Sequence, residues 1–512
     1  MRSEKVITNS IWGMAYKMVT IILGFVGRTV FIRYLGPAYL GISGLFSNIL
    51  SMLSLSELGF STAITFHLYK VLAKNDQETI TGIMNFYKVF YRIIAAFIAV
   101  VGTALIPFLP HIMAESTFSV EYVSLVYAIS LFKIVVSYLF SYNFTLIIAD
   151  QKQYMITKID IVMHILMSCV NILSLILFQD YIVYLAGEIL LVILSNILKS
   201  VRVWKTYPYL KEKHKISKQK RKTILSDVKN IFAGKVATVV VTSTDNILIS
   251  SMISITTVGY YSNYSMIIGY VQMFLSQITT ALHAGLGNML ATESKEYSYK
   301  ILKISTLLLH FITSFCAVCL FVLLTPFVRI WLGEAYTLDI MTVFWCVLSF
   351  YLQTMKTPLW HSISGVGYFK KDRNIAIYGA VSNLVVSFLA VKAWGLPGVF
   401  FGTVFSQATQ WFFKTKLFVK DYIEKKTGEY LCISGGLTAL TLLMAVVLYF
   451  GIDLLSVSNV YLDFFVRLAT CLIVPNGLNW LLFRKTEAFA YCKKLVMSKG
   501  KALMQRVKPG KK

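Results

Sequence analysis

The 512-residue chain is 57% hydrophobic and only 14% charged, and its formal net charge is +25. Soluble globular domains are about 45–50% apolar and about 25% charged, so this composition excludes an ordinary water-soluble protein. The Lys and Arg residues cluster in short segments between apolar runs. This distribution argues against a nucleic-acid-binding surface and for positively charged cytoplasmic loops.

Apolar runs, each long enough for a membrane helix of about 20 residues, are separated by short polar segments. Their approximate spans are 9–33, 38–66, 82–108, 119–147, 156–178, 181–201, 228–253, 258–288, 299–326, 338–361, 374–392, 396–416, 429–450 and 461–483. The first run is expected to be retained, because no signal-peptide cleavage pattern follows it. Pro358, inside the tenth run, predicts a kink. The sequence therefore predicts an all-α polytopic membrane protein of about 14 transmembrane helices.

The loops predict the orientation. The loop after the sixth run is the richest in cations, with seven Lys and Arg residues between Lys211 and Lys222. The alternate loops at 109–118, 254–258 and 451–463 contain neither Lys nor Arg, although Arg329 and Lys392 lie on that side. This asymmetry places both termini in the cytoplasm. The short outer loops argue against a membrane polymerase or glycosyltransferase, which would need a larger outer segment.

Pairs of residues recur at nearly constant offsets. Gly41 and Gly259 are 218 positions apart, as are Lys17 and Lys235. Pairs from the sixth and twelfth runs are 215 positions apart: Gly187 with Gly402, and Lys199 with Lys414. Internal repeats of this kind are typical of secondary transporters, whose substrate site lies near the middle of the membrane.

The repeat predicts two pseudo-symmetric six-helix lobes and a C-terminal helix pair. We expect an N-lobe at 1–201, a basic cytoplasmic linker at 202–227 and a C-lobe at 228–418. Two further helices and a basic cytoplasmic tail occupy 419–512.

Ionisable residues inside apolar runs are costly in a bilayer and tend to face a cavity. The runs contain Lys17, Arg28, Glu57, Lys88, Arg92, Lys133, Lys235 and Asp245. Lys17 and Arg28 are eleven positions apart, so they share one face of a helix, three turns apart. Lys88 and Arg92 lie near a cytoplasmic end, where their side chains can reach the headgroups.

These charges predict a cationic cavity. Arg28, Lys17, Lys133 and Lys235 would bind the phosphates of an anionic substrate, since guanidinium and ammonium groups match phosphate oxygens. Asp245 and Glu57 are candidates for ion coupling or gating. Two alternatives stay open: Arg28 pairs with Asp245 as a gate or packing bridge, and Glu57 makes a helix–helix contact. Cys316 and Cys319 form a C-x-x-C inside an apolar helix, where thiols behave as small hydrophobes, so no metal and no cofactor are expected.

Several segments match a known family. They are Gly27-Arg28, Arg33-Tyr34-Leu35-Gly36-Pro37, Leu40-Gly41, Glu57-Leu58-Gly59, Thr244-Asp245-Asn246-Ile247 and Gly259-Tyr260-Tyr261. In this order and spacing the chain resembles the Wzx-type oligosaccharide flippases of the multidrug/oligosaccharidyl-lipid/polysaccharide exporter superfamily. The resemblance covers essentially the whole chain.

The resemblance implies a two-lobed helical protein with a central cationic cavity and no covalent chemistry. It implies export of undecaprenyl-pyrophosphate-linked repeat units across the bacterial cytoplasmic membrane, for capsule, O-antigen or exopolysaccharide assembly. Arg28 would contact the substrate by matching position. The implied partners are the lipid-linked oligosaccharide, membrane lipids and a polysaccharide polymerase with its chain-length machinery, with H⁺ or Na⁺ as a coupling ion.

Three other functions are weighed against this one. A flippase for the peptidoglycan precursor lipid II shares the fourteen helices and the cationic cavity. A multidrug antiporter of the same superfamily has twelve helices and an acidic cavity, which fits less well. A membrane polysaccharide polymerase is disfavoured by the short outer loops.

Overall fold

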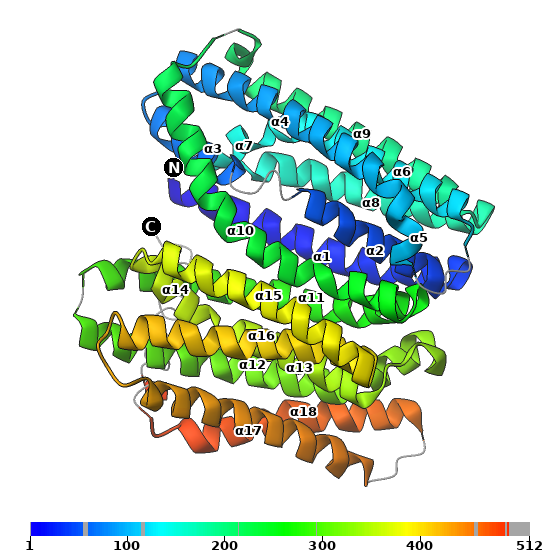
Figure 1. Ribbon diagram of the computed structural model, residues 1–512, viewed down its shortest axis with the longest axis vertical. Coiled ribbons are helices and arrows are strands. Elements are labelled where there is room, and N and C mark those ends of the chain that lie inside the picture. The colour runs from blue at the N-terminus through cyan, green and yellow to red at the C-terminus, as the bar shows by residue number, and fades with distance from the viewer. Residues whose placement is uncertain are drawn as a thin grey trace, which may run out of the picture. The chain divides into compact units, whose positions relative to one another are not determined.

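The structure is a computed structural model that describes residues 2–54, 60–113, 118–212, 214–292, 294–454, 459–486 and 489–490. Within these ranges every regular element is a helix (Figure 1). The chain forms two compact units, Met1–Ser262 and Asn263–Lys512.

The helices of the first unit alternate with short connections. They are α1 (Arg2–Leu35), α2 (Pro37–Leu53), α3 (Phe60–Leu72), α4 (Gln77–Leu105), α5 (Leu109–Ile112), α6 (Val120–Ser141), α7 (Phe144–Ala149), α8 (Tyr154–Phe178), α9 (Tyr181–Thr206) and α10 (Lys218–Met252). α11 (Ile255–Thr292) begins in the first unit and continues into the second.

The second unit continues with long helices. They are α12 (Lys295–Leu332), α13 (Ile340–Met355), α14 (Thr357–Gly365), α15 (Phe369–Trp394), α16 (Leu396–Thr415), α17 (Thr427–Asp453) and α18 (Val460–Phe483). α15 packs along α16, and α12 contacts α13, α17 and α18. The C-terminal pair α17–α18 is thus anchored on α12.

The helices have the length and composition of membrane spans. Among the described residues, nine helices are long and apolar enough to cross a bilayer. Their outward surfaces carry large apolar side chains, such as Leu177 at 69% and Leu190 at 68% exposure. Such surfaces require a lipid environment. The chain is a multi-pass membrane protein, as its sequence predicts.

Each predicted apolar run falls on one helix or on two consecutive helices. The run 38–66 comprises α2 and the first half of α3, and the run 338–361 comprises most of α13 and the start of α14. The break between α13 and α14 falls at Lys356, two residues before Pro358. Because proline lacks a backbone N–H and clashes with the preceding turn, it fits only the first turn of a new helix. The kink predicted at Pro358 is confirmed, and it takes the form of a break between α13 and α14.

Side-chain caps explain where several helices begin. A carboxylate, hydroxyl or amide oxygen accepts a hydrogen bond from a backbone N–H of the first turn, which otherwise lacks a partner. The capping residues are Asp76, Ser119, Asp180, Ser217, Ser294, Asp339 and Asn459.

The basic segment after α9 is attached to the first unit. Asn85 of α4 donates from Nδ2 to the carbonyl oxygens of Glu212 and His214, each at 3.3 Å. α10 then begins at Lys218, ten residues before the expected C-lobe, and packs on α2 and α3. The compact units divide the chain after Ser262, whereas the six-plus-six division of the repeat stays a prediction.

Candidate functional site

Two repeat-related glycines form a reciprocal crossing of α2 and α11. A side-chain carbon at Gly41 would lie 1.9 Å from the carbonyl oxygen of Ile255. One at Gly259 would lie 2.0 Å from the carbonyl oxygen of Pro37. Pro37 and Ile255 are themselves 218 positions apart, as the two glycines are. Each helix therefore places its glycine against the equivalent backbone of the other, which only glycine allows.

A third pair extends the same contact by one turn. A side-chain carbon at Gly44 would lie 3.0 Å from Oγ of Ser262, again 218 positions away. The crossing lies at the first turns of α2 and α11, beside the short connections that follow α1 and α10. These connections lack Lys and Arg, so the crossing joins the two helices at the end predicted to be extracytoplasmic.

Arg28 lies seven residues before the end of α1, and its side chain is half-buried. The hydroxyl of Tyr184 in α9 lies within electrostatic range of both the Arg28 guanidinium and the Glu188 carboxylate. The Tyr184 ring meets Phe31 edge-on, with ring centroids 5.3 Å apart. Aromatic packing therefore fixes the helix faces on which Arg28 and Glu188 lie.

Lys133 of α6 forms an ion pair with Glu188. Its Nζ lies 3.0 Å from Oε2, and the two side chains are 26% and 22% exposed. Arg28 and Glu188 both lie within electrostatic range of Tyr184, so Arg28, Lys133 and Glu188 belong to one part of the first unit. Arginine and lysine side chains are the groups that bind anionic ligands in proteins.

Lys17 and Asp245 are also placed in the first unit. Lys17 is half-buried in α1, three helical turns before Arg28. Asp245 is half-buried in α10, and its neighbour Asn246 faces Gly44 of α2. Asp245 therefore lies on the helix that packs beside the glycine crossing. Lys235 is part of α10, but its side chain is outside what the structure describes, and Glu57 lies outside the described residues.

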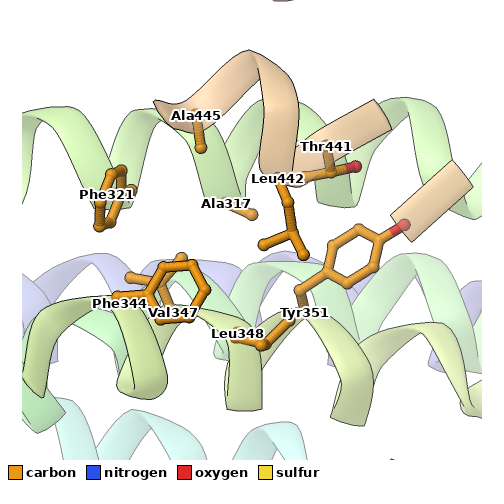
Figure 2. Close-up of a pocket in the computed structure, with 9 residues that line it drawn as sticks. All are labelled: Ala317, Phe321, Phe344, Val347, Leu348, Tyr351, Thr441, Leu442 and Ala445. Carbon is orange, nitrogen blue, oxygen red and sulfur yellow. The ribbon is translucent and has the colours of Figure 1, made fainter. Parts of the chain in front are cut away.

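The second unit contains an apolar cleft between α12, α13 and α17. Figure 2 shows its lining: Ala317, Phe321, Phe344, Val347, Leu348, Tyr351, Thr441, Leu442 and Ala445. Its only side-chain oxygens are those of Tyr351 and Thr441. A phosphate or sugar would lose its hydration there without replacement, so the cleft suits only an apolar group.

The sequence model of polysaccharide biosynthesis proteins matches residues 6–283, more than half of the chain. The chain belongs to the polysaccharide biosynthesis protein family. No curated protein matches this sequence.

Solved structures of transporters share the fold of this polysaccharide biosynthesis protein. A lipid II flippase, MurJ, in an inward closed conformation, matches with a TM-score of 0.69 at 14% identity, and the match covers 93% of this chain and 99% of MurJ. An inward-facing multidrug resistance transporter of the MATE family and MOP superfamily matches with a TM-score of 0.65 at 13% identity, and the match covers 80% of this chain and 98% of the transporter. A MOP superfamily transporter from Pyrococcus furiosus, described as having a binding pocket of reverse polarity, matches with a TM-score of 0.55 at 13% identity, and the match covers 82% of this chain and 96% of that transporter.

At these identities the likeness shows the fold alone, and it confirms the predicted all-α MOP-superfamily architecture. The solved structures that share this fold are described as transporters and a flippase. The lipid II flippase covers more of this chain than the drug transporters do, as expected if the C-terminal helix pair is part of the shared fold.

The sequence analysis did not identify two residues of this site, Glu188 and Tyr184. Glu188 is an ionisable residue inside an apolar run, so the criterion that selected Lys133 also applies to it. Tyr184 carries no charge and gave no signal, because tyrosines are abundant in this chain.

Proposed function

We propose that this protein is a flippase that moves polyprenyl-pyrophosphate-linked oligosaccharides from the inner to the outer leaflet of a bacterial cytoplasmic membrane. Membership of the polysaccharide biosynthesis family carries the proposal. It is supported by the half-buried cations of α1 and α6, because such groups are costly in a membrane protein unless an anion or a polar cavity receives them.

In the proposed mechanism, Arg28, Lys17, Lys133 and Lys235 contact the pyrophosphate. Arg28 offers a planar fork of N–H donors that binds two phosphate oxygens at once, while the lysines act as point charges. The cations offset the desolvation of the phosphates as the headgroup leaves water. The prenyl chain stays in the lipid throughout, so only the polar part crosses.

The glycine crossing of α2 and α11 supports alternating access. In the proposed mechanism this backbone contact closes the outer end of these helices, and substrate enters from the opposite, cytoplasmic side. Parting of α2 and α11 would then open the outer side. Both termini and the basic loops are cytoplasmic in this proposal.

The coupling ion is proposed to act at Asp245, beside the crossing, with Glu57 as a second candidate. Protonation or Na⁺ binding at Asp245 would change the charge next to the helices that must separate. The test is Asp245→Asn in a transport assay with imposed H⁺ and Na⁺ gradients. Normal transport that still depends on a gradient excludes Asp245 as the coupling group.

The decisive experiment deletes the gene and analyses surface polymers and lipid-linked intermediates together. We expect one surface polysaccharide to disappear while its finished lipid-linked unit accumulates on the cytoplasmic face. Its polymerase and chain-length machinery would then act after this protein. Unchanged polymers with altered drug sensitivity would overturn the proposal and favour a drug antiporter.

A lipid II flippase is the second candidate, because the structural match to MurJ extends over 93% of this chain. Lethality of the deletion, with lipid II trapped inside, would favour it. Viability of the deletion strain with an intact cell wall would exclude lipid II transport as an essential function of this protein.

A further inference from the structure

Neutral polar side chains of α13 and α16 form a hydrogen-bonded group in the second unit. Nε2 of Gln407 donates to Oγ of Ser349 at 3.0 Å and to Oε1 of Gln353 at 3.2 Å. We call Ser349, Gln353 and Gln407 the amide cluster. All three lie inside apolar runs, where a polar side chain needs a partner or a polar surface.

The exposed face of α13 changes character along its length. Met341, Trp345, Ser349 and Gln353 follow one another at four-residue spacing, so they form one stripe on the helix. The stripe is apolar at its start and polar at its end, and Gln353 is exposed. A face in contact with lipid would stay apolar throughout, because a carboxamide loses its hydrogen bonds in hydrocarbon. The end of the stripe therefore presents a polar side chain that a lipid-facing surface would not favour.

The cluster has unused hydrogen-bonding capacity. Gln407 is 2% exposed, and within the described part of the chain its Oε1 is buried without a hydrogen-bond partner. A carboxamide both donates and accepts, and it carries no charge. Sugar hydroxyls also donate and accept, so the two groups are complementary.

Two lysines lie beyond the cluster, at the C-terminal ends of α13 and α16. Lys356 follows Gln353 by three residues and lies within electrostatic range of Lys414 and Asp372. Lys414 of α16 is buried and forms an ion pair with Asp372 of α15. Lys356 and the Lys414–Asp372 pair therefore lie beyond the neutral cluster. The cluster itself offers only uncharged donors and acceptors, which match the hydroxyls of a sugar.

We propose that Ser349, Gln353 and Gln407 form a saccharide subsite that recognises hydroxyls of the sugar portion of the transported lipid. This inference rests on the proposed flippase function and adds to it a set of residues that selects for sugar. The cations of the first unit recognise phosphate, which every such lipid carries. The amide cluster discriminates between lipids that share the phosphate and differ in the sugar.

The test compares two probes on the full chain in lipid nanodiscs. One is unglycosylated polyprenyl pyrophosphate, and the other is the lipid-linked saccharide that accumulates when the gene is deleted. We expect the wild-type protein to prefer the saccharide. Gln353→Met and Gln407→Met keep side-chain volume and remove hydrogen bonds, so each should lower the preference about 3- to 10-fold. Binding of the sugar-free probe should stay unchanged.

Gln410→Met is the matched control. Gln410 is a buried amide on α16, three residues after Gln407, and its Nε2 donates to Oγ of Ser406 at 3.1 Å. Gln410→Met therefore removes an amide that lies outside the cluster. Because Gln353 is exposed, its variant keeps the test valid even if Gln407→Met fails to fold.

The outcomes separate the two proposals. Equal binding of both probes by the wild type, or an unchanged preference in Gln353→Met, overturns the saccharide subsite and leaves the flippase intact. An equal loss of preference in Gln410→Met also overturns it, since the effect would then come from helix packing. If no lipid-linked saccharide accumulates in the deletion strain, or if the wild type binds neither probe, the flippase proposal fails as well.

Discussion

Two polar groups, one in each compact unit, offer different chemistry inside apolar helices. The first unit carries ionic groups, with Arg28 near Tyr184 and Lys133 paired with Glu188 at 3.0 Å. The second unit joins α13 to α16 by neutral amides, with Gln407 bonded to Gln353 at 3.2 Å. The difference matters for the proposed function, in which the charges bind an anionic headgroup and the amides bind its sugars, because charge attracts phosphate without distinguishing between sugars. The predictions below test that division.

The largest effect is expected at the glycine crossing of the first unit. Gly41→Ala and Gly259→Ala should each abolish export, because a Cβ would overlap a backbone carbonyl and force α2 and α11 apart. Overpacking of this kind costs roughly 1–3 kcal/mol. Surface polymer should be measured at matched protein levels. Gly27→Ala and Gly269→Ala are the controls, since nothing lies within 4 Å of a Cβ at either position.

The reciprocity of the crossing sharpens this prediction. The Gly41 and Gly259 variants should be equally impaired, because each glycine meets the equivalent backbone of the other helix. A defect in only one of them would show that the two contacts are not equivalent.

Arg28→Ala should lower transport about 10- to 100-fold. Hydrogen bonds to charged groups contribute about 1.5–3 kcal/mol, and alanine removes all of them. Arg28→Lys should keep part of the activity, since it retains the charge and loses the fork. Transport of the trapped lipid in reconstituted vesicles is the measurement. Full transport by the alanine variant would refute the phosphate role of Arg28.

A buried charge in the second unit should behave differently. Arg467 of α18 is 7% exposed and bonds Asp453 at 2.5 Å and Asp463 at 2.7 Å. Arg467→Met leaves both carboxylates unpaired and should lower the thermal unfolding temperature by several degrees, for a loss of about 1–3 kcal/mol. The preference between sugar-bearing and sugar-free lipid should not change. If Arg467→Met instead lost phosphate binding and kept its stability, charges of the second unit would also bind phosphate, contrary to the proposed roles of the two units.

Glu188→Gln should have a modest and opposite effect. Removing the carboxylate frees Lys133 for phosphate, so binding of inorganic pyrophosphate should become about 3- to 10-fold tighter, the equivalent of one ordinary hydrogen bond. Asp160→Asn is the matched control, because Asp160 pairs with Lys199 at 3.0 Å elsewhere in the first unit. Weaker binding in Glu188→Gln would instead show that the carboxylate positions Lys133 for the ligand.

The sequence predicted the membrane fold because apolar run length follows directly from bilayer thickness. The sequence also shows the offset of 218 positions between Gly41 and Gly259, while the two-lobe repeat inferred from it stays a prediction. What it could not supply is the contact between them, since an offset in sequence does not say that the two copies touch. The reciprocal approach to Pro37 and Ile255 appears only in three dimensions.

Charges were easier to find than their partners. Lys133 is conspicuous inside an apolar run, but its ion pair with Glu188 depends on how α6 packs on α9. Gln353 and Gln407 gave no signal, because single amides are common in membrane helices and become a cluster only when α13 and α16 pack together. The roles of Lys17, Asp245 and the other candidate residues stay predictions.

The smallest effect is expected at the ion pair between α12 and α17. Nζ of Lys303 lies 2.9 Å from Oε1 of Glu429. The two side chains are 36% and 53% exposed, so Glu429→Gln should cost at most about 1 kcal/mol. Acid protonates the Glu429 carboxylate and removes the charge that pairs with Lys303. The difference in unfolding temperature between wild type and variant should therefore be present at pH 7 and shrink below about pH 4. A difference that persists in acid would mean that Glu429 acts through packing, and that the helix pair is not held to α12 by charge at this end.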